Sequence, residues 1–162
     1  MALYTVTNLG NATPSQTNVA STPGKTMLQV AAATSGSREF IYEWDVGADG
    51  APNAMDCAIV WAALMQTTAG SGGVSMTTNP LDAADAASKG VALGNFTGEP
   101  TGANTTIRWS LAANQRASYR WVVNPGGPGE IIVPLTNLTG LGIRAYSPTY
   151  ASTAVVTMFF RE

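Results

Sequence analysis

The chain has 162 residues, of which 45% are hydrophobic and only 11% are charged, whereas an average globular domain is about one quarter charged. This length suits one domain with a single hydrophobic core, and the scarcity of charge suggests that much of the surface contacts other protein. Eight basic and ten acidic residues give a net charge of −2 with no run of Lys or Arg, so we expect no nucleic-acid partner.

The N-terminal part of the chain is predicted to differ in structure from the rest. Residues 1–24 begin with an alternating apolar stretch from Leu3 to Val6 and continue as a segment rich in Asn, Thr, Ser, Pro and Gly. This composition predicts a short strand followed by an extended arm or loop. Residues 25–162 are predicted to form one β-sandwich domain, which begins with a strand over Lys25–Ala32.

The next two segments predict strands of different kinds. Arg38–Val46 alternates with a period of two, which predicts a half-buried antiparallel strand whose aromatic side chains point inward. The inward face would carry Phe40, Tyr42, Trp44 and Val46, and the other face Glu39, Ile41, Glu43 and Asp45. Met55–Thr67 is apolar on both faces and predicts a central strand. A helix is the alternative for this run, because Ala, Leu and Met favour helices.

Residues 67–88 form a long excursion that starts as a Thr, Gly and Ser loop and then becomes rich in Ala and Asp. Asn79 can cap a helix that has Pro80 at its first position, and Gly90 can end it after Lys89. We therefore predict one or two helical turns here.

The remaining segments predict short strands separated by turns. Thr105–Leu111 and Arg116–Val123 alternate regularly and are separated by a few residues, which predicts a hairpin. Further strands are expected over Glu130–Pro134, Leu141–Ser147 and Thr153–Phe160. About nine strands and at most one short helix predict an all-β fold, an antiparallel β-sandwich that is jelly-roll-like or immunoglobulin-like.

The sequence offers little to support catalysis. Histidine is absent, which removes Ser-His-Asp and Cys-His mechanisms and the commonest ligands of transition metals. Cys57 lies in an apolar run and is expected to be a buried, inert thiol. The longest apolar run is too short to span a bilayer and no signal peptide is apparent. We therefore expect no enzyme, no cofactor and no membrane partner.

Three groups of residues nevertheless suggest a site. Glu43 and Asp45, roughly 7 Å apart on one strand, fit the carboxylate pair of a glycosidase; the alternative is ion pairing with an arginine across the sheet. The candidate arginines are Arg108, Arg116 and Arg120. Calcium sites from Asp45, Asp49 and Asp56, or from Asp82 and Asp85, lack an ordered ligand spacing. The four tryptophans suggest core packing, or else a sugar-stacking platform.

Two stretches carry a resemblance to a known family. They are "ALMQTTAGSGGVSMTTNPLDAADAAS" and the closing "YRWVVNPGGPGEIIVPLTNLTGLGIRAYSPTYASTAVVTMFFRE". Together they resemble the capsid decoration, or cement, proteins of tailed bacteriophages. The resemblance implies a jelly-roll or sandwich subunit that assembles as a homotrimer and binds the major capsid protein on the outer surface of the head. It also implies a virion location after assembly in the cytoplasm of a bacterial host.

Under this interpretation, apolar residues outside the core should gather where subunits meet. The expected subunit or capsid contacts lie on the N-terminal arm and on the excursion: Leu3, Tyr4, Val6, Val74 and Met76. The alternative function is a carbohydrate- or receptor-binding sandwich module of a head fibre or tail, and a carboxylate-based glycan hydrolase is a more distant one.

Overall fold

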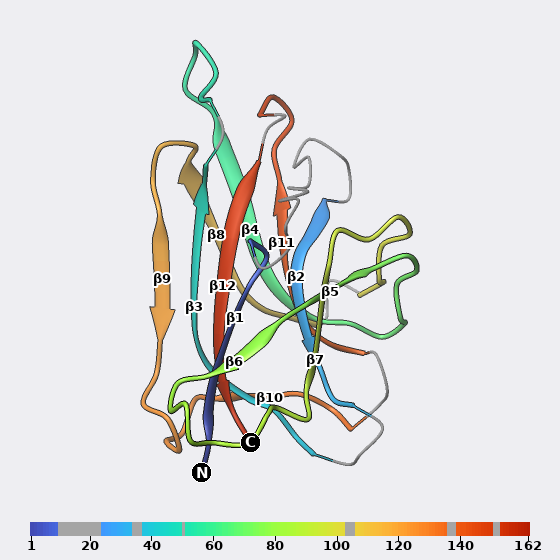
Figure 1. Ribbon diagram of the computed structural model, residues 1–162. Coiled ribbons are helices and arrows are strands. Elements are labelled where there is room, and N and C mark those ends of the chain that lie inside the picture. The colour runs from blue at the N-terminus through green and yellow to red at the C-terminus, as the bar shows by residue number, and fades with distance from the viewer. Residues whose placement is uncertain (10–23, 34–36, 50, 103–105, 136–138, 151–152) are drawn as a thin grey trace.

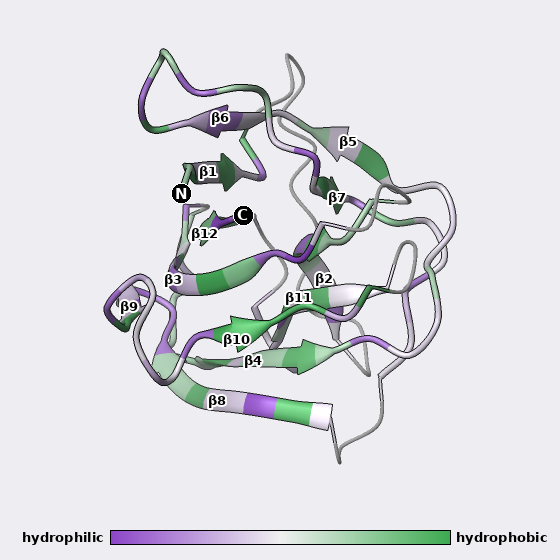
Figure 2. Ribbon diagram, turned by 90° about the horizontal axis from the view of Figure 1, so that it is seen from below, coloured by the Kyte–Doolittle hydropathy of each residue, from purple (hydrophilic) through white to green (hydrophobic). Residues whose placement is uncertain are grey.

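The computed structural model describes residues 1–9, 24–33, 37–49, 51–102, 106–135, 139–150 and 153–162 (Figure 1). These residues form two antiparallel six-stranded sheets packed face to face, which confirms the predicted β-sandwich. Sheet 1 has the order β10-β3-β12-β1-β6, with β9 also paired to β3, and sheet 2 has the order β5-β7-β2-β11-β4-β8. Figure 2 shows the layers and places β8 outermost in sheet 2.

The strands of sheet 1 are β1 (Leu3–Thr7), β3 (Phe40–Ala48), β6 (Thr78–Pro80), β9 (Tyr119–Val122), β10 (Ile131–Ile132) and β12 (Ala154–Arg161). Those of sheet 2 are β2 (Lys25–Ala31), β4 (Ala58–Met65), β5 (Val74–Met76), β7 (Val91–Gly94), β8 (Ile107–Asn114) and β11 (Gly140–Tyr146). The apolar run around β4 is thus a strand and not a helix, and it lies between β11 and β8.

The hydrophobic core lies between the two sheets. Sheet 1 contributes Trp44 and Met158, and sheet 2 contributes Trp61 and Ile143, all of them completely or almost completely buried. Period-two alternation explains this arrangement, because every second residue of β12 is buried while the residues between are only partly covered. Burial of these large side chains is the main source of stability of such a fold.

The alternation predicted for β3 is wrong at one point. Phe159 of β12 lies opposite Glu43, whereas the next residue, Phe160, lies opposite Ile41, so Tyr42 is an extra residue on β3. Such a bulge reverses which residues face inward. Ile41 therefore joins Trp44 in the core.

The hairpin predicted for the strands around residues 107–122 is also wrong. β8 pairs with β4 in sheet 2, whereas β9 pairs with β3 in sheet 1. The turn between β8 and β9 thus carries the chain from one sheet to the other. β5 and β6 make the same change of sheet on the opposite side, with Thr77 alone between them. The sandwich is consequently bridged by the chain on both sides.

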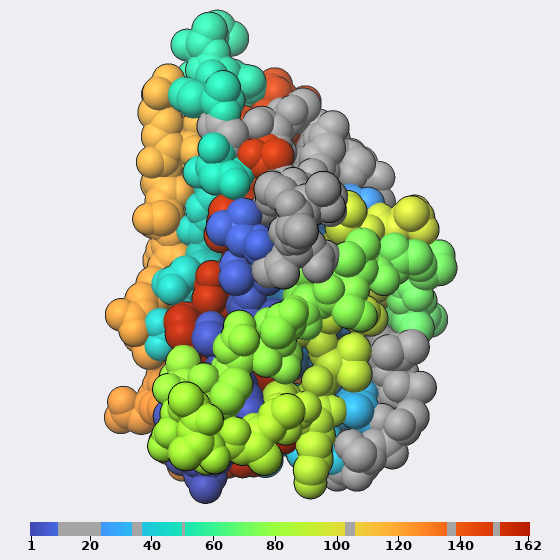
Figure 3. Space-filling model, in the orientation of Figure 1, coloured from blue at the N-terminus to red at the C-terminus, as the bar shows by residue number. Residues whose placement is uncertain are grey.

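The helix predicted after Asn79 is absent from the described residues, and its cap and first residue belong to β6 instead. Thr5 lies opposite Asn79 and Tyr4 opposite Pro80, while the Leu81 N–H donates to the Leu3 carbonyl at 2.8 Å. Sheet pairing thus outweighs the local capping signal. Figure 3 shows this segment, in green, crossing the front of the molecule against the blue N-terminal strand. Of the arm or loop predicted over residues 8–24, residues 10–23 lie outside the described part of the chain.

The first part of the excursion packs against another loop of the same chain. Residues 66–73 meet residues 95–102 through a bridge between Ser71 and Gly98 and a hydrogen bond of 2.8 Å from Thr67 N to Thr101 O. These two loops lie over the part of the outer face of sheet 2 that β2 and β11 form, where the Pro100 carbonyl accepts a hydrogen bond from Arg144. Glu99 there accepts a hydrogen bond from the Thr26 amide at 2.7 Å and pairs with Lys25 at 3.0 Å. Thr26 is completely buried as a result.

Candidate interaction surface

An aromatic cluster fills the side of the sandwich where β8 and β9 lie. Trp44 stacks on Trp121 with the ring centroids 3.9 Å apart, and Trp109 stacks on Tyr119 at 5.4 Å. Trp109 also meets Trp44 edge to face at 5.5 Å. Because Trp109 and Tyr119 come from different sheets, the cluster links the two layers. Each ring stacks on another ring of the cluster, which fits packing better than a free sugar-stacking platform.

Exposed hydrophobic side chains lie on the strands next to this cluster and just beyond them. We call them the β8–β10 patch, and its members are Val60, Ile107, Tyr119, Val122, Ile132 and Leu135. They come from β4, β8, β9, β10 and the residues just after β10. β9 and β10 share the edge of β3 that β12 leaves open. Val122 and Ile132 point to the outer face of sheet 1, because the residues before them, Trp121 and Ile131, pack against the core, whereas Val60 follows the core residue Ile59 and points to the outer face of sheet 2. The part of the patch on β9 and β10 is therefore the candidate protein-binding surface.

The carboxylate pair proposed from the sequence is engaged in ion pairing. Arg120 Nε lies 2.6 Å from Glu43 Oε1 and 3.9 Å from Asp45 Oδ1, and the arginine comes from the neighbouring strand β9. Burial and the charge of Glu43 raise the pKa of Asp45, and Arg120 opposes this shift. The arrangement is the cross-strand ion pair of the alternative interpretation.

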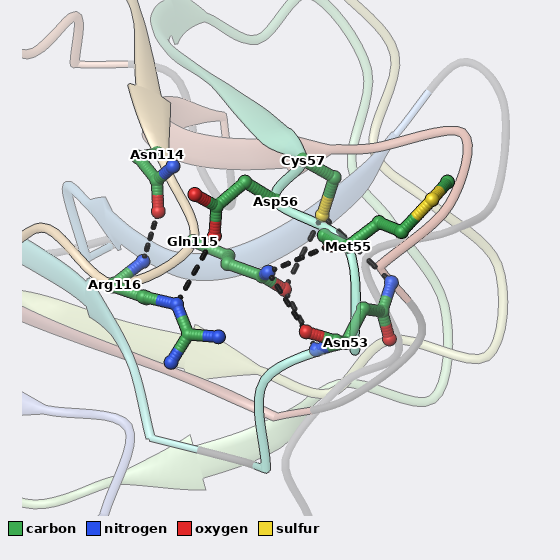
Figure 4. Close-up of polar contacts among 7 residues, drawn as sticks. All are labelled: Asn53, Met55, Asp56, Cys57, Asn114, Gln115 and Arg116. Atoms are coloured by element: carbon green, nitrogen blue, oxygen red, sulfur yellow. Dashed lines mark hydrogen bonds and ion pairs between the residues drawn. The ribbon is translucent and has the colours of Figure 1, made fainter.

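A polar network fixes the loop between β3 and β4 to the turn between β8 and β9 (Figure 4). At its centre is the buried side chain of Gln115. Its Oε1 accepts from Asn53 N at 3.0 Å and from Cys57 Sγ at 3.3 Å, while its Nε2 donates to Met55 O at 3.1 Å. Arg116 beside it pairs with Asp56 at 3.1 Å. Cys57 is partly exposed, and its thiol is therefore less buried than predicted.

Replacement of Gln115 by alanine is expected to lower the free energy of unfolding by about 2 kcal/mol, because several buried hydrogen bonds are lost at once. The loop over residues 51–56 should then be cleaved faster by a protease. Chemical denaturation and limited proteolysis measure the two effects. Asn114→Ala is the matched control in the same turn, since its exposed side chain accepts the Arg116 N–H and hydrogen-bonds to the exposed Asp56; equal losses in both variants would contradict the role of Gln115.

The contact residues predicted from the sequence do not gather on one surface. Tyr4, Val6 and Met76 are buried in this chain's own core, and Tyr4 stacks on Phe160 with centroids 5.4 Å apart. Leu3 is partly covered and Val74 is exposed. Only these last two therefore have a side chain available to a partner. Strand periodicity could have identified the core positions, because Tyr4 and Val6 alternate with more exposed neighbours.

Glu39 is a buried acidic residue, which the predicted alternation of its strand placed on the solvent-exposed face. Its side chain is completely buried, and among the described residues neither carboxylate oxygen has a hydrogen-bond partner. Burial, opposed by the Glu39 backbone amide and assisted by the nearby charge of Glu162, raises its pKa to about 7. The Glu39 side chain packs against Gly90, where an added Cβ would lie 2.9 Å from Glu39 Cγ.

The described residues contain no group of three His, Cys, Asp or Glu side chains placed to hold a metal ion. In the same part of the chain, no helix is long and apolar enough to cross a membrane. Comparisons with protein-family models, curated proteins and solved structures gave no match.

Proposed function

We propose that this chain is a structural protein of a tailed-bacteriophage virion that binds the outer surface of the assembled capsid as a homo-oligomer and stabilises it. The observation that supports the proposal is the exposed apolar pair Val122 and Ile132 of the β8–β10 patch, on the outer face of a sandwich whose best carboxylate pair is held by Arg120. The sparse charge of the chain and its resemblance to capsid decoration proteins support the same function.

The mechanism would be binding energy alone. A ligand that binds the assembled shell but not its dissociated subunits stabilises the shell by mass action, by about 2.7 kcal/mol per site at a concentration one hundred times the dissociation constant. An oligomer that contacts several capsid subunits multiplies weak individual contacts. In this proposal, the partner is the major capsid protein, and the protein is assembled onto the head in the bacterial cytoplasm.

Purified protein mixed with capsids that lack it is expected to co-sediment with them and to raise their melting temperature. Replacing Val122 and Ile132 together by serine should weaken this binding at least tenfold, because two apolar contacts of the patch are lost. Leu9 and Leu81, which are exposed outside the patch, provide the matched control when replaced in the same way. Absence of both binding and stabilisation with the unmodified protein would contradict the proposed function.

A carbohydrate- or receptor-binding module of a head fibre or tail is the second candidate. One observation favours it, namely that Tyr119 stays exposed beside the half-buried Trp109. Binding of oligosaccharides with quenching of tryptophan fluorescence, together with failure to bind capsids, would favour this function.

A further inference from the structure

Strand β8 forms a long free edge of sheet 2. It pairs with β4 on one side, and on the other side no strand of the described chain pairs with it. The strand has eight residues, Arg108 is its only charge, and it contains neither Pro nor Gly. Natural proteins usually protect such an edge with charges, proline or a short strand length, because its unpaired backbone groups bind other strands.

The register with β4 shows which backbone groups point outward. Gln115 N donates to Cys57 O at 3.0 Å, and Asn114 lies opposite Ala58. In an antiparallel pair, every second residue directs its N–H and C=O toward the partner strand. Counting back from Gln115, Ala113 and Leu111 therefore bond to β4, whereas the N–H and C=O groups of Ala112 and Ser110 point to the free edge.

The side chains of β8 are incompletely covered on the core side. Trp109, Leu111 and Ala113 alternate with exposed residues, and each of these three is only half-buried although Trp109 and Ala113 pack against the core. The neighbouring strand that would complete their burial is missing from this edge. The two outward-facing residues between them, Ser110 and Ala112, are small and uncharged, so neither blocks the approach of another strand.

We propose that a second copy of this chain binds to the β8 edge, with the two β8 strands antiparallel and related by a two-fold axis at Leu111. In this register, Ser110 and Ala112 of the two copies form hydrogen-bonded pairs, Trp109 lies opposite the small Ala113, and Leu111 meets its own copy. Arg108 lies opposite Asn114 and not opposite another arginine. The strand is thus self-complementary in size and charge, as an isologous contact requires.

The inference rests on the homo-oligomer of the proposed function and names its contact. The proposed β8–β8 contact joins the two copies of sheet 2 into one continuous sheet, a recognised mode of strand addition. The resemblance to decoration proteins implies a trimer, whereas this contact makes pairs. The oligomeric state therefore decides between them.

The first test measures oligomeric state by size-exclusion chromatography with light scattering. The full chain is expected to have twice the mass of one copy. Ala112→Pro removes an outward N–H and leaves the bonds to β4 in place, which is where an edge strand tolerates proline. Loss of two hydrogen bonds per dimer should weaken dimerisation roughly thirtyfold or more. Ala112→Ser keeps the N–H and is the control.

The second test examines the register and does not depend on proline. Ser110→Lys combined with Ala112→Lys places like charges opposite each other across the two-fold axis and should give monomers. Ser110→Lys combined with Ala112→Glu places opposite charges there and should give dimers. Both substituted positions, Ser110 and Ala112, are exposed, so melting temperatures close to that of the unmodified protein are expected.

The inference is overturned if the unmodified chain is monomeric, if it is a trimer, or if Ala112→Pro and the double-lysine variant both remain dimers. If both variants of the register test stay dimeric while Ala112→Pro is monomeric, the β8 edge remains the contact but the proposed register is overturned. Capsid binding is measured separately. An unmodified monomer that still binds capsids overturns the inference and the homo-oligomer of the proposed function, but leaves capsid binding in place. A dimer that binds no capsid overturns the proposed capsid function and leaves the inference in place.

Discussion

Replacing Glu39 by glutamine is expected to increase the free energy of unfolding by roughly 3 kcal/mol at pH 8 and to leave it unchanged at pH 4. The carboxyl group is completely buried, and its two oxygens lack hydrogen-bond partners among the described residues. Such a group must either stay protonated or carry an unpaired charge inside the protein. Glutamine has nearly the same shape and no charge, so it removes this cost.

The direction of the pH dependence follows from the two pKa values. The ordinary value for the unfolded chain is 4.5, and burial raises the value in the folded protein to about 7. Between these values the unfolded chain releases a proton that the folded chain keeps. Glu39 therefore costs nothing below pH 4, an increasing amount from pH 4.5 to pH 7, and a constant amount above about pH 8.

Urea denaturation of both proteins between pH 4 and pH 9 measures the effect. The two stability curves should coincide at pH 4, separate between pH 4.5 and pH 7, and differ by a constant amount above about pH 8. Curves that stay parallel, or a glutamine variant that is less stable at pH 8, would contradict the assignment of an unpaired buried carboxyl group to Glu39.

Replacing Arg161 by methionine is expected to lower the free energy of unfolding by about 3 kcal/mol at pH 7, because it leaves a buried carboxylate without its cation. Arg161 holds Glu130 with two hydrogen bonds, of 2.7 and 2.6 Å. The Glu130 side chain is only 5% exposed. This pair ties the turn before β10 to the last strand, and the guanidinium also lies 4.0 Å above the Phe40 ring.

The pH dependence of this second effect has the opposite sign. Hydrogen bonds from Arg161, against the effect of burial, lower the pKa of Glu130. The stability that this carboxylate contributes is therefore present above its ordinary pKa of 4.5 and is lost as the pH falls through the lower folded value. The difference between the unmodified protein and the Arg161→Met variant should accordingly shrink in acid.

Arg116→Met is the matched control for this comparison. Arg116 and Asp56 form an ion pair whose two side chains are 55% and 65% exposed, and exposed pairs contribute less than about 1 kcal/mol. Thermal and urea denaturation at pH 7 should therefore separate the two arginine variants. Equal losses of stability would show that burial of Glu130 does not decide the effect.

Much of the fold can be predicted from the sequence, because strand alternation and turn residues are local signals. The segments around β2, β4, β11 and β12 lie where their patterns indicate. Which strands pair with each other, however, is not decided by local sequence. Nothing in the residues between β8 and β9 shows that these strands enter different sheets, since this depends on the space that Trp109 and Trp121 fill between the layers.

The candidate site was harder to predict for the same reason. Tyr4 and Val6 could be expected to face a core, but their pairing with β12 and β6 comes from strands more than 70 residues away. The bulge at Tyr42 shifts the face of each residue before it, which is why Glu39 is buried and not wet. The alternation up to Val46 gives no sign of this extra residue.

The crossing of the chain between β5 and β6 has a consequence for assembly. It leaves strands of only three residues at the side of the sandwich opposite β8, too short to serve as a template for a further copy. Pairing through β8 uses the longest edge strand among the described residues, since β5, β6, β9 and β10 have four residues or fewer, so the described part of the product offers no second edge of this length. Assembly of this kind ends at a closed pair and does not propagate into fibrils.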